Sequence, residues 1–256
     1  MPHTGSRDLI LRVEQVGGFV APQALLQRYP SFSLYGDGTV ITVGAQPEIY
    51  PQPALPPLIS TRVSPSGVQA ILAAARRAGL LGPPADYHGV LMPDSPDTVF
   101  TLRSDARIHT VRVTALGAPV PAGSNVSAQE RRARQALAAL ANHLSDLRSW
   151  LPSGSVGPDH PYVPAAARVF VTDGAPQGTP HEPTIAWPLS TPLSTFGAPI
   201  PTPLQAGPTR CGVVQGGDLN KLLAKARVAN QLTPWKSDAR TFGLSFRPLL
   251  PDESGC

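Results

Sequence analysis

Proline is the feature of this sequence that most restricts its fold. The 256-residue chain contains 31 Pro and 23 Gly. Proline fixes φ and has no backbone N–H, so it is excluded from helix interiors and from central strands of a sheet. Many of these residues gather between segments with a regular apolar pattern, notably at 47–57 and 190–209. We therefore expect a folded scaffold with long, stiff loops.

The first half of the chain carries clear strand and helix signals. Alternating residues predict a strand over 8–16 and a hairpin over 31–43, with a turn at Gly36–Gly38 where positive φ is available. A strand is expected over 58–63. Ser64 and Pro65 then start a helix that ends at Gly79.

A second hairpin and a longer helix follow. Residues 98–113 alternate on both sides of a turn at Ser104–Asp105. Ser127 and Glu130 have the spacing of a capping box, which predicts a helix start. The helix carries an apolar stripe that we expect to pack against a sheet or another helix, formed by Ala133, Leu137, Leu140, Leu144, Leu147 and Leu151.

The second half repeats this mixture of elements. Strands are expected over 167–174, 184–189, 210–215 and 240–250, and a helix over 217–232. The pattern predicts an α+β fold with antiparallel sheets and helices packed on one face. We expect an N-terminal α+β module over 1–151, a Pro/Gly linker over 152–166 and a C-terminal α+β module over 167–256. One continuous domain is the alternative.

An internal repeat is a further hypothesis. At an offset of 151 residues, the two strand–helix segments match at apolar and Arg positions: Val63, Val68, Ile71, Leu72, Ala75, Arg76, Ala78 and Leu81 fall opposite Val214, Leu219, Leu222, Leu223, Ala226, Arg227, Ala229 and Leu232. The alternative is that any two amphipathic helices match at their apolar positions.

The two cysteines are Cys211 and Cys256, and Cys256 is the last residue. A disulfide between them would fix a tail that otherwise frays, and it would indicate an oxidising compartment. The alternative is two unrelated reduced thiols, with one of them buried in a strand.

The charge pattern gives little support to nucleic-acid binding. The net charge is +4, and the dense basic run is Arg131, Arg132 and Arg134 at the start of a predicted helix. A nucleic-acid-binding protein concentrates its basic residues in one stripe. We expect this run to be a solvated helix face, and nucleic-acid binding is the last of the functional hypotheses.

The sequence contains no recognisable catalytic, metal or cofactor motif. No HExxH, GxSxG, GxGxxG or P-loop pattern is present, so we expect no cofactor. The densest mixed group is Asp86, His88, Asp94 and Asp97 in a Pro-flanked loop. A solvated loop is the simplest interpretation. A secreted hydrolase whose site includes Asp86, His88 and Asp94 is the alternative.

Aromatic residues beside the Pro-rich segments suggest a binding surface. Rigid loops can present rings to a partner, and the candidate residues are Tyr50, Trp187, Phe196 and Trp235. The alternative is that these rings close over the core and hold the loops in place.

Several segments resemble secreted and lipoprotein-type proteins of high-GC bacteria that have no known activity. The resemblance is carried by Gly17–Val20 (GGFV) and by PSFSLYGDGTVI, YPQPALPPLISTRVSPSGVQAILAAARRAGLL, TRCGVVQGGDL and FRPLLPDESGC. It implies an envelope location and a disulfide between Cys211 and Cys256, and it assigns no catalytic residue. The sequence differs from this group in lacking a leader and a lipid-anchor cysteine.

These observations lead to one main functional expectation. No run of 18 apolar residues is present, and the N-terminus has no signal-peptide pattern, so an exported form would be one whose leader or lipid anchor has been removed. We expect a non-enzymatic extracellular or cell-envelope protein. It would act in binding or surface assembly, through its loops and sheet edges, on a protein or envelope component.

Overall fold

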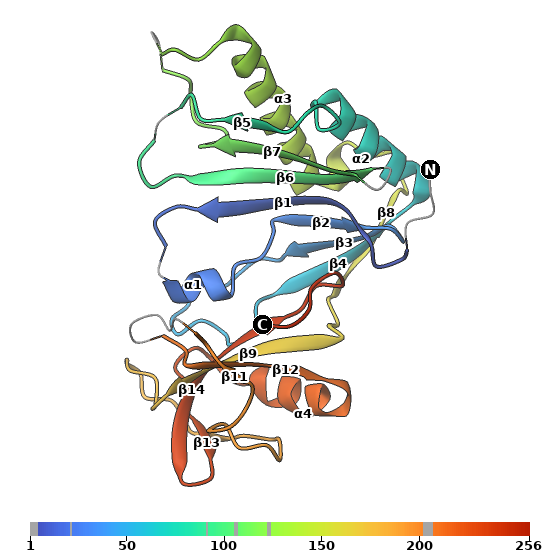
Figure 1. Cartoon of the computed structure of the whole chain (residues 1–256). Helices are drawn as coiled ribbons and strands as arrows, with labels where there is room; N and C mark the ends of the chain where they lie inside the picture. The colour runs from blue at the N-terminus through green and yellow to red at the C-terminus, as the bar shows by residue number, and fades with distance from the viewer. Residues whose placement is uncertain (1–4, 21, 91, 105–106, 122–123, 202–206) are drawn as a thin grey trace. The chain divides into compact units, whose positions relative to one another are not determined.

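The computed structural model describes residues 5–256, apart from 21, 91, 105–106, 122–123 and 202–206 (Figure 1). The chain divides into two units. Unit 1 contains Met1–Val20, Tyr29–Gly44 and Leu58–Tyr162, and unit 2 contains Ala21–Arg28, Ala45–Pro57 and Val163–Cys256. Both units combine helices with largely antiparallel sheet, which confirms the α+β fold class.

Unit 1 is built on an eight-stranded sheet. All neighbouring strands are antiparallel except β5 and β7, which run parallel. The sheet has the order β5-β7-β6-β1-β2-β3-β4-β8, and its strands are β1 (Leu9–Gly17), β2 (Phe32–Tyr35), β3 (Thr39–Val43), β4 (Leu58–Val63), β5 (Ala85–Tyr87), β6 (Pro96–Ser104), β7 (Arg107–Thr114) and β8 (Val156–Pro161).

Both predicted hairpins are confirmed. In the β2–β3 turn, Gly38 has a φ of +82°, and a Cβ at this position would lie 2.4 Å from the carbonyl oxygen of Val63. Only glycine fits there, because both the backbone conformation and the close approach exclude a side chain. The second hairpin pairs β6 with β7 as far as Ser104 and Arg107. Asp105, the other expected turn residue, lies outside the described residues.

The helices of unit 1 start where the sequence predicts. Helix α2 (Pro65–Arg77) is capped by Ser64, whose Oγ accepts from the Gly67 N–H at 3.2 Å. Helix α3 (Ala128–Ser145) is capped by Ser127 in the same way, through Glu130 N at 3.0 Å. A short 3-10 helix, η1 (Leu147–Ser149), follows α3. These side-chain caps satisfy N–H groups that have no partner within the helix.

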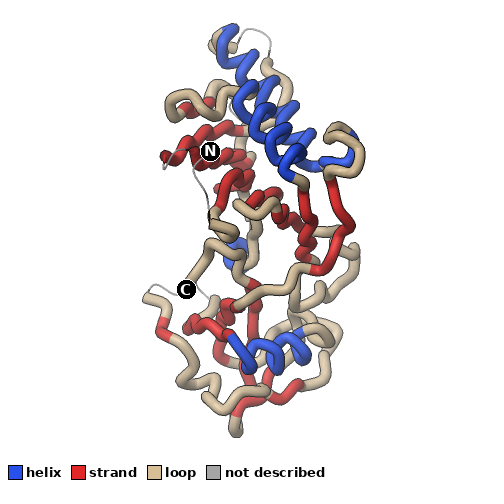
Figure 2. The backbone as a smooth tube through the Cα atoms, turned by 90° about the vertical axis from the view of Figure 1, so that its right-hand side faces the viewer, coloured by secondary structure: helices blue, strands red, loops and turns tan. Residues whose placement is uncertain are grey.

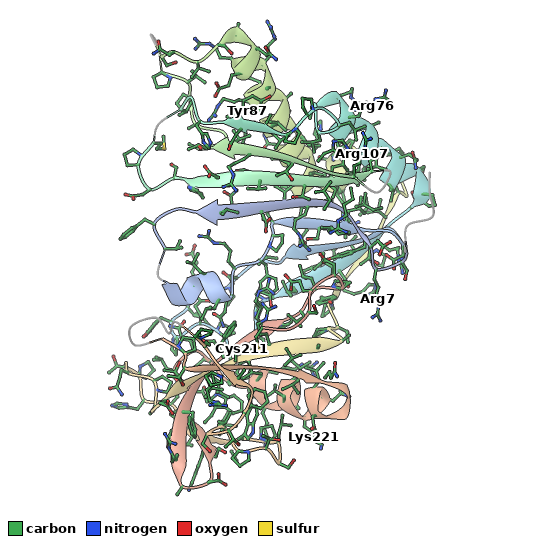
Figure 3. The ribbon with its side chains drawn as sticks, viewed as in Figure 1. Arg7, Arg76, Tyr87, Arg107, Cys211 and Lys221 are labelled. Carbon is green, nitrogen blue, oxygen red and sulfur yellow. A yellow bond between two sulfur atoms is a disulfide. The ribbon has the colours of Figure 1, made fainter. Side chains whose placement is uncertain are left out.

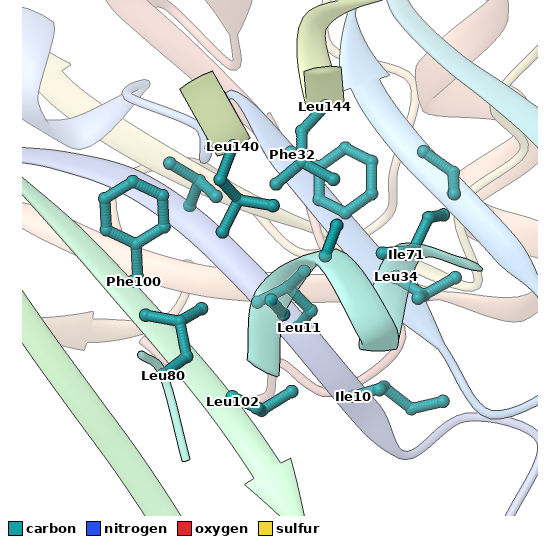
Figure 4. Close-up of a cluster of buried hydrophobic side chains, with 14 of the residues drawn as sticks. Ile10, Leu11, Phe32, Leu34, Ile71, Leu80, Phe100, Leu102, Leu140 and Leu144 are labelled. Atoms are coloured by element: carbon teal, nitrogen blue, oxygen red, sulfur yellow. The ribbon is translucent and has the colours of Figure 1, made fainter. Parts of the chain in front are cut away.

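The core of unit 1 lies between the sheet and the two helices. Helices α2 and α3 contact each other, and both appear on the same side of the strands (Figure 2). Their apolar faces pack on alternate residues of the strands, and the cluster includes Leu11, Phe32, Leu34, Phe100, Ile71, Leu137, Leu140 and Leu144 (Figure 4). Among the described residues of unit 1, the other face of the sheet carries the remaining alternate residues and no helix.

Unit 2 has a six-stranded sheet and one principal helix. The order is β10-β13-β14-β9-β12-β11, and the elements are α1 (Pro22–Leu26), β9 (Ala166–Asp173), β10 (Ile185–Ala186), β11 (Ala198–Pro199), β12 (Arg210–Gln215), α4 (Gly216–Ala226), β13 (Trp235–Ser237) and β14 (Arg240–Pro248). Leu219, Leu222 and Ala226 of α4 pack on the aromatic core of the sheet. Helix α4 ends six residues before the expected position 232. Beyond the helix, the Ala229 carbonyl accepts a hydrogen bond from the Ala54 N–H, and the Gln231 N–H donates to the carbonyl of Gln52.

The units do not follow the expected boundaries at 151 and 166. The stretch 152–166, which we expected to be a linker, contains β8, which pairs with β4 through Thr61 and Asp159. Arg148 donates to the carbonyls of Val156 and Gly157 and stabilises this Pro-containing strand. Segments 21–28 and 45–57 belong to unit 2. Contacts between residues far apart in the sequence decide which unit each of these segments joins, and the local sequence pattern does not predict such contacts.

A disulfide joins Cys211 in β12 to Cys256, with 6.0 Å between the two Cα atoms (Figure 3). Other contacts also hold the tail. Arg247 forms a bidentate ion pair with Glu253, with one of the two contacts at 2.7 Å, and Arg168 Nε donates to the carbonyl of Gly255 at 2.7 Å. The C-terminal tail is therefore anchored to the strands of unit 2 by covalent and polar contacts.

The internal repeat stays a prediction. The pairs β4–α2 and β12–α4 have the same order, and both helices pack on their own sheets. The strands around them differ, because β9 lies between β12 and β14, whereas β3 lies between β4 and β2.

Candidate functional site

The aromatic surface expected from the sequence is mostly absent. Trp187, Phe196 and Trp235 are buried in the core of unit 2. The ring centroid of Trp187 lies 5.5 Å from that of Phe196 and 6.4 Å from that of Trp235, in edge-on geometry. These rings close the core beneath the Pro-rich loops, so they do not offer a binding surface. Tyr50 alone of the four is exposed, at 63%.

The loop around His88 contains a chain of hydrogen bonds that joins three strands of unit 1. His88 Nε2 lies 2.8 Å from Asp86 Oδ1, and His88 Nδ1 lies 2.8 Å from Thr114 Oγ1. Thr114 donates to Asp97 Oδ1 at 2.6 Å, and Arg112 Nη1 donates to Asp97 Oδ2 at 3.0 Å. We call these five residues the His88 network.

Strand register explains why these residues meet. Val16, Asp97 and Thr114 are direct partners across β1, β6 and β7, and Tyr87 of β5 is paired with Val113. His88 therefore follows β5 beside Thr114. Because Val113 is buried against the helices, the residues that alternate with it lie on the helix-free face. The His88 network is thus at the end of the sheet where β1 and β7 finish and β6 begins, on the left of Figure 1.

A buried arginine holds the backbone behind the network. Arg134 of α3 is only 5% exposed, and its guanidinium donates to the carbonyls of Tyr87, Thr114 and Ala115. Glu130 lies 3.6 Å from it and accepts from the N–H of Gly89 at 3.1 Å. Tyr87, labelled in Figure 3, and Gly89 flank His88. Helix α3 therefore fixes the backbone on both sides of His88 and at Thr114.

This position of Arg134 alters the expectation for the basic run. Arg132 is exposed, but Arg134 points into the protein and pairs with Glu130. Burial lowers the pKa of the Arg134 guanidinium, and the charge of Glu130 opposes that effect. The three arginines therefore do not form a continuous solvated face.

Asp97 is a charged member of the network. The hydrogen bond from Thr114 lowers the pKa of this carboxyl, partial burial opposes the shift, and Arg112 lowers the pKa further. Asp97 is therefore ionised at neutral pH and accepts from both neighbours. Asp94, which the sequence grouped with Asp86 and His88, is outside this chain of bonds. It has a φ of 61°, and its carbonyl accepts from the N–H of Phe19 at 3.2 Å.

Four exposed apolar residues lie at the end of β1 and in the loops beside it, and we call them the apolar cluster. Val16 is in β1, Phe19 and Val20 follow it, and Met92 precedes β6; Phe19 is 87% exposed. Gly17 and Gly18 both have positive φ and turn the chain after β1. The bond from Phe19 to Asp94 holds the loop after β1 against the loop before β6. The apolar cluster therefore adjoins the His88 network, because Val16 of the cluster is the direct strand partner of Asp97.

The sheet edges are poorly suited to pairing with another chain. In unit 1, the edge strand β5 has three residues, and the edge strand β8 contains Pro158 and Pro161. In unit 2, the edge strands β10 and β11 have two residues each. Short strands and proline discourage strand addition. The edge strands of both sheets therefore disfavour the pairing with another chain that the sequence analysis expected.

The His88 network could not be recognised as a whole from the sequence. The sequence grouped Asp86, His88 and Asp97 with Asp94, whereas Arg112 and Thr114 join the network only through strand register. The available signal was the hairpin predicted over 98–113, whose pairing extends by one step to Asp97 and Thr114. For Arg134, the signal was its spacing of four residues from Glu130.

Comparison with known protein families, curated proteins and solved structures finds no match. Within the described ranges, no three His, Cys, Asp or Glu side chains gather in a way that could hold a metal ion. In the same part of the chain, no helix combines the length and apolar character needed to cross a membrane.

Proposed function

We propose that this chain is an extracellular or cell-envelope protein that binds a protein partner through the exposed end of the unit 1 sheet. The observation that carries this proposal is the apolar cluster, in which Phe19 is 87% exposed. Exposed apolar surface is removed from water when a partner covers it, and neighbouring exposed apolar residues mark interaction sites. Aromatic residues and Met are also enriched in the buried centres of protein interfaces.

The charges around the cluster specify the kind of partner. On this end of the sheet, Glu14, Asp86 and Asp97 lie on the helix-free face, and Asp94 lies in the adjoining loop. Arg112 is the cation that pairs with Asp97. The surface is acidic although the whole chain has a net charge of +4. It fits a partner with an apolar pocket flanked by Lys or Arg, and the association should weaken as salt is raised.

The disulfide supports the extracellular or envelope location. Both cysteines of the chain are used in the bond between Cys211 and Cys256. Structural disulfides persist in oxidising compartments and are rare in the cytosol. An envelope protein or another secreted protein is therefore the class in which the partner is sought. The resemblance to secreted and lipoprotein-type proteins agrees with this location and remains a prediction.

Site-specific photocrosslinking tests the proposed surface. p-Benzoylphenylalanine in place of Phe19 should yield one discrete crosslinked protein in the cells that produce this chain. The yield should fall at high salt and in an Asp94→Asn background, because the charge complementarity is then weakened while Asn still tolerates the positive φ of this position. The same probe in place of Val228, a 77% exposed residue of unit 2, serves as the matched control. Identical products from both positions, or none from Phe19, would reject the proposal.

A further inference from the structure

We propose that the basic end of the unit 1 sheet binds a linear polymer of phosphate groups. We define this basic end by five exposed arginines: Arg7, Arg76, Arg77, Arg103 and Arg107. It lies opposite the His88 network, because β6 begins beside the network at Pro96 and ends in the hairpin at Ser104. Binding of such a polymer goes beyond the proposed function and does not depend on it.

Strand register brings three of these arginines to one end of the sheet. Arg103 and Arg107 lie on the two sides of the turn between β6 and β7. Strand β1 runs antiparallel to β6, with Leu11 opposite Leu102. Arg7 comes just before β1, so it lies at the end where β6 finishes and β7 starts. The three residues therefore belong to neighbouring strands at the same end.

A series of backbone contacts joins the end of α2 to the start of β7. The carbonyl of Arg76 accepts from the N–H of Gly79 at 3.0 Å, and the carbonyl of Gly79 accepts from the N–H of Gly82 at 3.0 Å. The carbonyl of Gly82 lies 3.2 Å from His109 Nδ1 in β7. Figure 3 shows Arg76 and Arg107 at the same end of the unit 1 sheet. The last turn of α2 therefore adds its two arginines to the basic end.

The charges of the basic end are not neutralised by its described neighbours. None of the five arginines forms an ion pair with another described residue. Two carboxylates lie nearby. Asp37 pairs with Arg62 at 2.9 Å, and Asp8 accepts from the N–H of Gly5 at 2.6 Å. An excess of positive charge therefore remains on this surface.

The type of cation indicates the type of ligand. The dipole of α2 favours cations in its last turn, which accounts for Arg76 and Arg77. It does not account for Arg103 and Arg107, which add like charge in the adjoining hairpin. Guanidinium groups bind phosphate oxygens through two parallel N–H bonds. A ligand that carries phosphate groups would therefore neutralise this surface.

The spread of the arginines favours a polymer over a single phosphate. Neighbouring strands lie about 4.8 Å apart, so β7, β6 and β1 span about 10 Å. Helix α2 adds a further layer beside the sheet. One phosphate group cannot contact side chains from all of these elements at once. Successive phosphates along a flexible chain can do so.

The apolar residues at this end favour a polymer without bases. Among the described residues, the exposed large apolar side chains here are Leu81 and Ile108. Neither is aromatic, whereas proteins that bind single-stranded nucleic acid stack the bases on aromatic rings. The phosphate groups would therefore carry the recognition. Local sequence does not predict this surface, because its arginines come from four separate segments of the chain.

Fluorescence anisotropy with end-labelled inorganic polyphosphate tests the inference on the full, disulfide-bonded chain. Each neutralised phosphate of a single-stranded polymer contributes about −0.7 to the slope of log K against log salt concentration. Five contacts give a slope of about −3.5, so the affinity should fall about 10²-fold between about 50 and 200 mM salt.

Two double variants separate this surface from net charge. Arg103→Gln with Arg107→Gln should weaken binding by about 10-fold and make the slope shallower by about 1.4. Lys225→Gln with Arg227→Gln is the matched control, because it also removes two exposed positive charges, at the end of α4 in unit 2. The control should keep the wild-type slope, and circular dichroism should show that both variants are folded.

Three results would overturn the inference. They are a lack of polyphosphate binding at about 50 mM salt, equal slopes for the two double variants, and tighter binding of a thymidine oligonucleotide with the same number of phosphates. The last result would identify a nucleic-acid site. The Phe19 crosslink lies at the opposite end of the strands and does not depend on these outcomes, so the two proposals can fail separately.

Discussion

Replacing Arg134 by Met should lower the free energy of unfolding of unit 1 by about 3 kcal/mol. The guanidinium is buried and donates to the carbonyls of Tyr87, Thr114 and Ala115. Methionine has a similar reach but no donor. The substitution would leave three carbonyls without this partner and Glu130 without its cation. The loss should be largest around β5 and the end of β7.

Urea denaturation and hydrogen exchange followed by mass spectrometry measure this effect. Arg132→Met is the matched control, because Arg132 lies on the same helix and is exposed. We expect that change to alter stability by no more than about 0.5 kcal/mol. Exchange in Arg134→Met should rise first in peptides that contain residues 85–90 and 112–116. Equal stabilities of the two variants would show that Arg134 does not hold the backbone behind His88.

Replacing Cys256 by Ser should lower the free energy of unfolding of unit 2 by about 4 kcal/mol. The disulfide closes a loop with a sequence separation of 45 residues, and the chain-entropy model assigns about that stabilisation to a loop of this length. Arg247–Glu253 and the bond from Arg168 to Gly255 remain in the variant. They should keep part of the tail in place after the covalent link is lost.

The reduced wild-type protein provides the control for this variant. The reduced wild-type protein, kept in excess thiol reductant, should give a denaturation midpoint close to that of Cys256→Ser, well below that of the oxidised protein. The thiols are left unalkylated, because Cys211 is buried in β12 and an added group there would overpack the core. Identical midpoints for the oxidised and reduced proteins would show that the polar contacts alone anchor the tail.

Features set by neighbouring residues were predictable from the sequence. Ser64 and Ser127 cap their helices because a hydroxyl satisfies a free N–H within the next turn. Gly38 marks the hairpin because its backbone conformation is unfavourable for other residues. The stripe that includes Leu137, Leu140 and Leu144 is buried because helical periodicity directs it to one side.

Features set by distant contacts were not predictable in this way. Strands β5, β8 and β13 are short or contain proline, and pairing with a longer neighbour creates them. The segment 45–57 has no apolar period, and it joins unit 2 through bonds such as that from Ala54 N to the carbonyl of Ala229. Short edge strands carry too few residues for an alternating pattern to be recognised.

The candidate surfaces also show that local sequence predicts some features and that distant contacts decide others. The aromatic residues beside proline were expected at the surface, but packing on β9 and β14 draws Trp187 and Trp235 into the core. The exposure of Phe19 follows from the turn at Gly17 and Gly18, which carries the next residues beyond the end of the sheet. Local sequence identifies a ring or a charge, and only tertiary structure decides whether it is buried, exposed or paired.

Binding of the purified, disulfide-bonded protein to intact cells that produce it tests the central claim most directly. Fluorescently labelled protein should bind saturably, and Phe19→Ser should weaken the apparent affinity by about 30-fold, the effect of losing an interface residue worth 2 kcal/mol. Val228→Ser, in the other unit, should leave the affinity unchanged. Saturable binding that depends on Phe19 is the predicted result. Binding that does not saturate, or that is the same for Phe19→Ser and the wild type, would contradict the claim.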